Sequence, residues 1–183
     1  IFGRSMDISH SANTQPPVRL RSPETAQHAT DVRDDLFMPE LYRYTFPELV
    51  ATNRECGEDE ESYKAMAGFS FLYGLRFDMT IYRCCGSLRD IPRYAAYLKE
   101  ISALYEQYDF MLRGRFVDGD GFTSDSENVL VKGWEGCNGG LAVSLWNPTG
   151  EDQVVNLRSR KTGRAVTIVV PAERVAAAVI DEA

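Results

Sequence analysis

Five short β-rich runs in the last third of the chain constrain its fold more than any other feature. The runs are VLVKGWE, GGLAVSLWN, DQVVNLRS, AVTIVVP and RVAAAVID, at residues 129–135, 139–147, 152–159, 165–171 and 174–181. Turn sequences such as NPTGE, RKTGR and PAE separate them at the spacing of β-hairpins. Strands this close in sequence predict an antiparallel sandwich half or a small barrel. A domain boundary is expected near the segment GDGFTSDSEN, residues 119–128.

Two helices are predicted before this β-rich part. In residues 61–75, ESYKAMAGFSFLYGL, apolar and small residues recur at spacings of three and four, which predicts a buried helix. A clearer pattern follows Asp90 and Pro92, residue types that suit the first turn of a helix. We expect one helix that ends before Gly114. Its apolar positions are Tyr94, Leu98, Ile101, Tyr105, Tyr108 and Leu112. Residues 76–85, RFDMTIYRCC, are compatible with a strand or with an irregular continuation.

The first 55 residues are less regular. Residues 1–35 are rich in Ser, Thr, Asn, Asp and Pro without a sustained period, which indicates a loop or an extended arm. Residues 41–55, LYRYTFPELVATNRE, mix apolar and charged side chains. Pro39 and Pro47 argue against one uninterrupted helix there and favour extended segments joined by turns.

Composition and charge exclude several classes of function. The net charge of −7 argues against a general nucleic-acid binder, because phosphate binding needs clustered Lys and Arg. No apolar run approaches the roughly 20 residues of a membrane span, and the N-terminus lacks signal-peptide features. Because the chain starts with Ile1, we expect that a preceding piece was removed or that the chain is part of something longer.

The cysteines and histidines predict neither a metal site nor a catalytic dyad. The four cysteines include an adjacent pair and show no metal-ligand spacing, so they are interpreted as buried free thiols of a cytoplasmic protein. Both histidines fall in the loop-like arm, far from the cysteines in sequence. No cofactor is expected. These residues are Cys56, Cys84, Cys85, Cys137, His10 and His28.

Carboxylates are the remaining candidates for chemistry. The sequence has no phosphate loop, no GxGxxG, no GxSxG and no HExxH. Paired carboxylates can share a reaction in which one donates a proton while the other attacks or activates water. The candidate acids are Glu40, Glu48, Glu55, Asp78 and Asp118.

The layout over residues 36–183 resembles a known family. The segments PELYRYTFPELVATNRE, FDMTIYR and RYAAYLKEISALYEQYDFMLRGRFVDGDGF are followed by the β-rich tail that contains NPTGEDQVVNLRSRKTGRAVTIVV. Together they are similar to the C-terminal part of bacterial glycoside-hydrolase-like proteins, which have a (β/α)8 barrel followed by an antiparallel β domain. The resemblance implies a carbohydrate substrate and glycosidic-bond hydrolysis by paired carboxylates. The catalytic acids of that family lie on earlier barrel strands, and no position here matches them clearly.

The fold class expected from this resemblance is α/β plus all-β. Residues 1–35 would form an extended arm or barrel loop, 36–122 the last part of a (β/α)8 barrel, and 123–183 a small antiparallel β-sandwich domain. A whole barrel needs roughly 250 residues, about twice what precedes the β domain here. The rest would come from a missing N-terminal portion of the same protein. A different α+β arrangement that only resembles a barrel is the alternative.

The barrel interpretation assigns roles to the stretch 41–55. Barrel active sites lie at the carboxyl ends of the strands, so polar residues at that end are expected to face a pocket. Glu48 is the candidate catalytic acid; its alternative is an ion pair that fixes the turn after Pro47. Arg43, Tyr44, Asn53 and Arg54 are the candidate substrate-binding residues, because arginine can hydrogen-bond sugar hydroxyls and tyrosine can stack on a pyranose.

Two other classes of function stay open at this stage. The chain is alternatively a non-catalytic α+β module that binds carbohydrate or protein through its β tail. Trp134 and Trp146 would then be sugar platforms, whereas core packing is the simpler role for both. A homo-oligomer contact, suggested by the many aromatic residues, is a third hypothesis.

Overall fold

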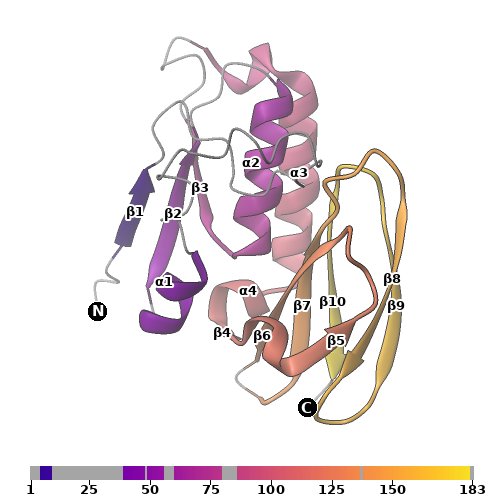
Figure 1. Cartoon of the computed structure of the whole chain (residues 1–183). Helices are drawn as coiled ribbons and strands as arrows, with labels where there is room; N and C mark the ends of the chain where they lie inside the picture. The colour runs from indigo at the N-terminus through magenta and orange to yellow at the C-terminus, as the bar shows by residue number, and fades with distance from the viewer. Residues whose placement is uncertain are drawn as a thin grey trace, which may run out of the picture.

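A computed structural model describes residues 5–9, 39–47, 49–55, 60–79, 86–136 and 138–181. For residues 5–9, 53–55, 60–63 and 79 the description covers the backbone. The fold is mixed α/β, with one parallel sheet and two antiparallel sheets (Figure 1). No helix in the described part of the chain is both long and apolar enough to cross a bilayer. The cysteines and both histidines lie outside the described residues.

The parallel sheet has the strand order β1-β2-β3. Its strands are β1 (Ser5–Ser9), β2 (Val50–Glu55) and β3 (Arg76–Met79), and both neighbouring pairs run parallel. Helix α2 (Glu60–Leu72) connects β2 to β3, as the sequence predicted for residues 61–75. Parallel neighbours need such a crossover because a tight turn cannot join them.

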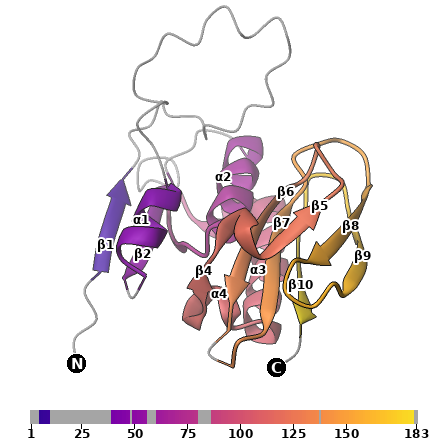
Figure 2. The ribbon, with the colours of Figure 1, turned by 60° about the horizontal axis from the view of Figure 1, so that its bottom comes forward.

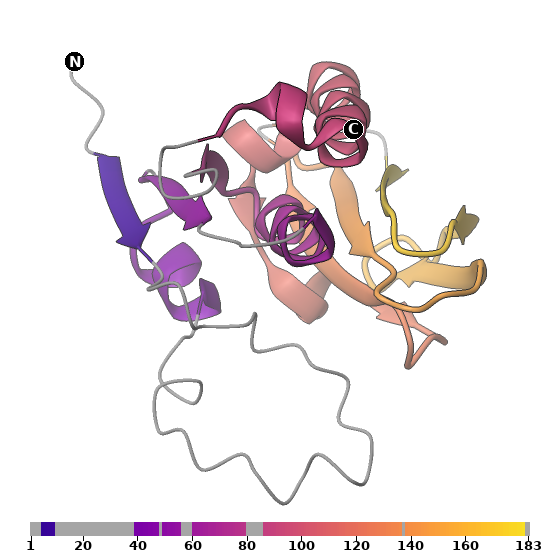
Figure 3. The ribbon, with the colours of Figure 1, turned by 90° about the horizontal axis from the view of Figure 1, so that it is seen from above.

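Helix α2 is the centre of the molecule. It packs on β2 and β3 on one side and on β7 of an antiparallel sheet on the other. Viewed from above, it lies end-on between the two sheets (Figure 3). Residues 67–72 are buried without interruption, as expected for a helix that is apolar on all sides. Gly68 lets the helix approach the indole of Trp146, since a β-carbon at Gly68 would come within 2.4 Å of Trp146 Nε1.

The antiparallel part confirms the five predicted strands. They are β6 (Leu130–Glu135), β7 (Leu141–Trp146), β8 (Gln153–Ser159), β9 (Ala165–Val170) and β10 (Val175–Asp181). Two short strands, β4 (Arg115–Phe116) and β5 (Phe122–Ser124), were not predicted. The sheets have the orders β10-β7-β6-β4 and β5-β8-β9 (Figure 2). Strand β7 is buried along its whole length because α2 covers one face and the second core lies on the other.

One hydrophobic core crosses the sequence position where a domain boundary was expected. Its members include Phe71 and Tyr94 from the helical part together with Trp134, Trp146 and Val175 from the β-rich part. A second core lies between the two antiparallel sheets and contains Val143, Val155, Leu157, Val170 and Ile180. The helical part and the β-rich part therefore share one of the two cores.

Two predictions about helices were wrong in detail. The segment after Pro39 was expected to be extended, but it forms helix α1 (Pro39–Thr45). Pro39 occupies the first helical position, where its missing N–H has no partner to lose, and Pro47 follows the helix end. The long helix expected as far as Leu112 is broken into α3 (Pro92–Gln107) and α4 (Phe110–Arg113), because Tyr108 adopts an extended conformation. Two 3-10 turns, η4 (Leu88–Asp90) and η5 (Asp118–Gly121), complete the fold.

Candidate functional site

The carboxyl edge of the parallel sheet gathers polar residues on neighbouring strands. Asn53 and Arg54 occupy the last positions of β2 before Glu55. Arg54 has the same register position as Ser9 of β1 and Asp78 of β3. Strand ends that lie side by side in this way can present several polar groups to one ligand.

The two faces of this sheet differ in polarity. Ala51 belongs to the core under α2, and Phe77 packs against that core. Because side chains alternate along a strand, Thr52 and Arg76 are on the opposite face, where they are register partners. Arg76 is exposed. The face turned away from α2 is therefore polar.

Arg43 of α1 lies at the other, amino end of the sheet. Its side chain is 8% exposed, and its guanidinium donates hydrogen bonds to the carbonyls of Tyr73, at 2.8 Å, and Gly74. It also lies 5.4 Å from the ring centroid of Trp134. Burial lowers the pKa of Arg43. Its donors are directed to the protein's own backbone, where they tie α1 to the turn between α2 and β3.

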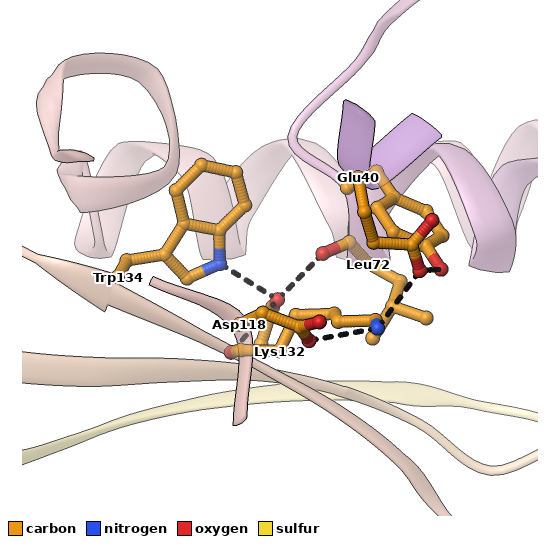
Figure 4. A network of polar contacts seen from close by, with 7 residues as sticks. Glu40, Leu72, Asp118, Lys132 and Trp134 are labelled. Carbon is orange, nitrogen blue, oxygen red and sulfur yellow. Dashed lines mark hydrogen bonds and ion pairs between the residues drawn. The ribbon is translucent and has the colours of Figure 1, made fainter. Parts of the chain in front are cut away.

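A lysine bridges two carboxylates beside Arg43. Lys132 Nζ lies 2.9 Å from Glu40 Oε1 and 2.8 Å from Asp118 Oδ1, and the Tyr73 hydroxyl donates to the same Glu40 oxygen (Figure 4). Glu40 comes from α1, Lys132 from β6 and Asp118 from η5. Three separate segments thus meet at one ammonium group.

The pKa values in this cluster favour the charged forms of lysine and glutamate. Burial alone would raise the pKa of Glu40, but hydrogen bonds from Tyr73 and Lys132 outweigh it and lower the pKa. Burial alone would lower the pKa of Lys132, but its hydrogen bonds with Asp118 and Glu40 raise it. Burial and the bond to Glu40 raise the pKa of Tyr73, so its hydroxyl keeps its proton. A fully paired, ionised cluster of this kind stabilises structure and offers no vacant acid or base.

Both tryptophans are core residues. Trp134 is 1% exposed and Trp146 is 4% exposed. Trp134 Nε1 donates to Ser144 Oγ at 2.9 Å, and that hydroxyl donates to the carbonyl of Leu72 at 2.7 Å (Figure 4). Neither ring is presented to solvent as a platform for a sugar.

The structure places the predicted site residues at two opposite ends of β2. Arg43 and Tyr44 lie on α1 at the amino end, and Tyr44, half-exposed, packs edge-on against Phe116. Asn53 and Arg54 lie at the carboxyl end. Glu48 is outside the described residues.

Of the candidate acids, Glu40 and Asp118 are brought together around Lys132. Sequence reasoning missed Lys132 and Tyr73. Lys132 is the single charged residue between apolar neighbours in VLVKGW, which was the available signal for a buried charge that needs partners.

A small apolar hollow lies between α1 and β2. The empty space in this hollow, together with the part open to solvent, is about 290 Å³. Its lining residues are Pro39, Tyr42, Arg43, Phe46, Leu49, Ala51 and Leu75. No described cluster of His, Cys, Asp and Glu could hold a metal ion.

Comparison with known proteins found no relative. No protein-family model matches the chain, and no curated protein sequence matches it. The case for a function therefore depends on the fold and on the residues described above.

Replacing Lys132 by Met should lower the free energy of unfolding by about 1–2 kcal/mol near pH 7, because two part-buried carboxylates lose their shared cation. The depressed pKa of Glu40 stabilises the folded state above its ordinary pKa, and this contribution is lost as the pH falls through the folded-state pKa. The variant should therefore lose less stability than the parent between about pH 7 and about pH 3. Urea unfolding at both pH values checks this, and equal losses would contradict it.

Proposed function

We propose that this chain is the C-terminal portion of a carbohydrate-active enzyme that hydrolyses glycosidic bonds with paired carboxylates. At least one of these carboxylates would come from a preceding part of the same protein. The observation that carries the proposal is the order of the parallel strands. Among the described strands, β1, β2 and β3 are consecutive in both sequence and space, a helix crosses from β2 to β3, and an antiparallel β domain follows.

This strand order is the one that a (β/α)8 barrel requires. Barrel strands add in sequence in one direction, as do the strands within one half of a doubly wound sheet, so the order supports the barrel without excluding a doubly wound sheet. Among the described strands, β1 and β3 are each paired on one side. Parallel sheets are normally covered on both faces, and here α2 covers one face while the other is polar. Further barrel strands would pair with the outer strands and enclose that polar face.

Within a barrel, the carboxyl ends of the strands would form the substrate site. Arg54 is the residue of this chain proposed to bind sugar hydroxyls or a substrate carboxylate, because it shares the polar face with Thr52, whereas Asn53 alternates to the α2 face with Ala51. Glu48 lies outside the described residues. It is kept as a secondary candidate, and the proposal rests on Arg54.

Replacing Arg54 by Ala in the full-length encoded protein should lower kcat/KM on aryl glycosides by about 10- to 100-fold. The loss of a charge-assisted hydrogen bond costs about 1.5–3 kcal/mol, and each 1.4 kcal/mol is about tenfold. Arg158→Ala is the matched control, because Arg158 is an exposed arginine on β8, in the antiparallel part. Rates are measured over a panel of glycosides, with circular dichroism to verify folding.

Two outcomes would overturn this assignment. Hydrolysis that is unchanged by Arg54→Ala would remove Arg54 from the substrate site. Binding of oligosaccharides by calorimetry without hydrolysis of any glycoside would favour the non-catalytic module instead. The buried positions of Trp134 and Trp146 argue against a tryptophan platform in that module.

A further inference from the structure

The outer edge of β9 is unprotected. Strand β9 ends the sheet β5-β8-β9, and no described strand pairs with its far side (Figure 2). Its sequence, AVTIVV, has neither charge nor proline. The other edges of the two antiparallel sheets are blunted: β4 has 2 residues, β5 has 3, and β10 has a register shift between Val179 and Asp181. Long, flat, uncharged edges are the ones that pair with another chain.

The hydrogen bonds of β8 show which groups of β9 point outward. Asn156 is the register partner of Thr167. Its N–H donates to Asp125 Oδ1 at 2.8 Å, and its carbonyl accepts from the N–H of Asp125 at 3.3 Å. Both main-chain groups of Asn156 are thus used on the β5 side of β8. The main-chain groups of Thr167 therefore point away from β8, to the open edge.

The turn of the β8–β9 hairpin independently gives the same alternation of bonded and non-bonded pairs. The N–H of Ser159 donates to the carbonyl of Arg164 at 2.9 Å, so that pair is a bonded one. Bonded and non-bonded pairs alternate along an antiparallel ladder. Ala165, Thr167 and Val169 consequently all present their N–H and C=O groups at the open edge.

The outward face beside this edge carries an exposed apolar pair. Val154 and Val169 are register partners, and they are 60% and 58% exposed. They form an exposed valine pair at the edge of the sheet. A strand added to β9 would cover part of Val169, the member of the pair that lies on the edge strand.

The two ends of β9 carry opposite charges. Basic residues lie in the turn before β9: exposed Arg160, Lys161 and Arg164. Acidic residues lie beside the other end of the strand: exposed Glu151, Asp152 and Glu173. An antiparallel copy of the same strand would place its basic end beside the acidic end of the first.

We propose that two copies of this chain pair antiparallel through β9, about a two-fold axis at Thr167. In this register Thr167 lies opposite the partner's Thr167, and Ala165 lies opposite the partner's Val169. All the outward main-chain groups of Ala165, Thr167 and Val169 then find partners, and Lys161 approaches the partner's acidic turns. The contact is isologous, so it closes as a dimer. Because the contact is small, its dissociation constant is expected in the micromolar range. The inference does not depend on the proposed enzymatic function.

Sedimentation velocity over a concentration series tests this dimer. The chain should sediment as a dimer at about 100 µM and dissociate on dilution. Thr167→Lys sets two ammonium groups opposite each other at the axis and should raise the dissociation constant at least about tenfold. Val154→Lys is the matched control: it puts the same charge on the same face, but on β8, which β9 separates from the open edge. Its dissociation constant should change less than about threefold.

A charge exchange identifies the orientation of the two copies. Lys161→Glu should weaken the dimer by about threefold or more, and adding Glu151→Lys should restore it. A chain that is monomeric at about 100 µM overturns the proposal. So does a dimer that Val154→Lys dissociates but Thr167→Lys does not. Circular dichroism shows that each variant is folded.

Discussion

Replacing Gly68 by Ala should lower the free energy of unfolding by about 2 kcal/mol. The added β-carbon would lie 2.4 Å from Nε1 of Trp146 and 2.7 Å from two further indole atoms. Overpacking a close-packed core costs about 1–3 kcal/mol, a contact this short belongs at the upper end of that range, and the better helix propensity of alanine returns about 1 kcal/mol. Because both α2 and β7 are buried at this point, neither can move aside without disturbing a second layer. The melting temperature should fall by about 4–8 °C.

Two comparisons make this prediction specific. Gly150→Ala is the matched control, since a β-carbon there meets nothing within 4 Å, and its stability should stay within about 0.5 kcal/mol of the parent. Trp146→Phe makes room for the new methyl group, so the double variant should show a favourable coupling of about 1 kcal/mol. An unaltered Gly68→Ala protein would mean that α2 and β7 are not in contact as described.

Replacing Arg43 by Met should cost about 3 kcal/mol. The change leaves the carbonyls of Tyr73 and Gly74 without their donor. Arg43 is only 8% exposed, so this loss occurs at a buried position. Hydrogen bonds from charged groups contribute about 1.5–3 kcal/mol each. The variant also avoids the cost of burying the guanidinium charge, and this offsets part of the loss. Chemical denaturation near pH 7 measures the loss. Arg43→Lys keeps the charge but not the planar fork, so it should recover less than half of the lost stability.

Arg113→Met serves as the control for Arg43. The Arg113 side chain is 76% exposed and forms one surface ion pair with Asp109, so its loss should cost less than about 1 kcal/mol. Equal effects at Arg43 and Arg113 would show that the buried fork does not hold α1 in place.

The sequence predicted those elements whose signal is local. The five strands β6 to β10 were found because turn residues separate alternating or β-branched runs. Helix α2 was found from its small and apolar residues. The break at Tyr108 was missed because the apolar period continues through it, although the backbone of Tyr108 is extended.

The arrangement around Lys132 was not predictable from spacing. Glu40 and Lys132 are 92 positions apart, and Asp118 belongs to a third segment. Composition identified Glu40 and Asp118 as candidate acids but could not show that one lysine neutralises both. Arg43 was interpreted as a residue for a ligand, whereas its donors are used by the carbonyls of Tyr73 and Gly74. Ion pairs and hydrogen bonds between distant segments depend on the fold, so the local sequence does not predict them.

The position of α2 between two sheets also affects the order in which the chain can fold during synthesis. Ser144 bonds the carbonyl of Leu72, 72 positions earlier, and Lys64 pairs with Glu173, 109 positions away. The ribosome releases the helix long before the strands that cover its second side. Until β7 emerges, the side of α2 that will contact Trp146 stays uncovered, which is the condition in which a nascent chain is most prone to aggregate. Completion of this core therefore has to wait for β7 and β10, and a chaperone that shields α2 until then would protect the most vulnerable part of the molecule.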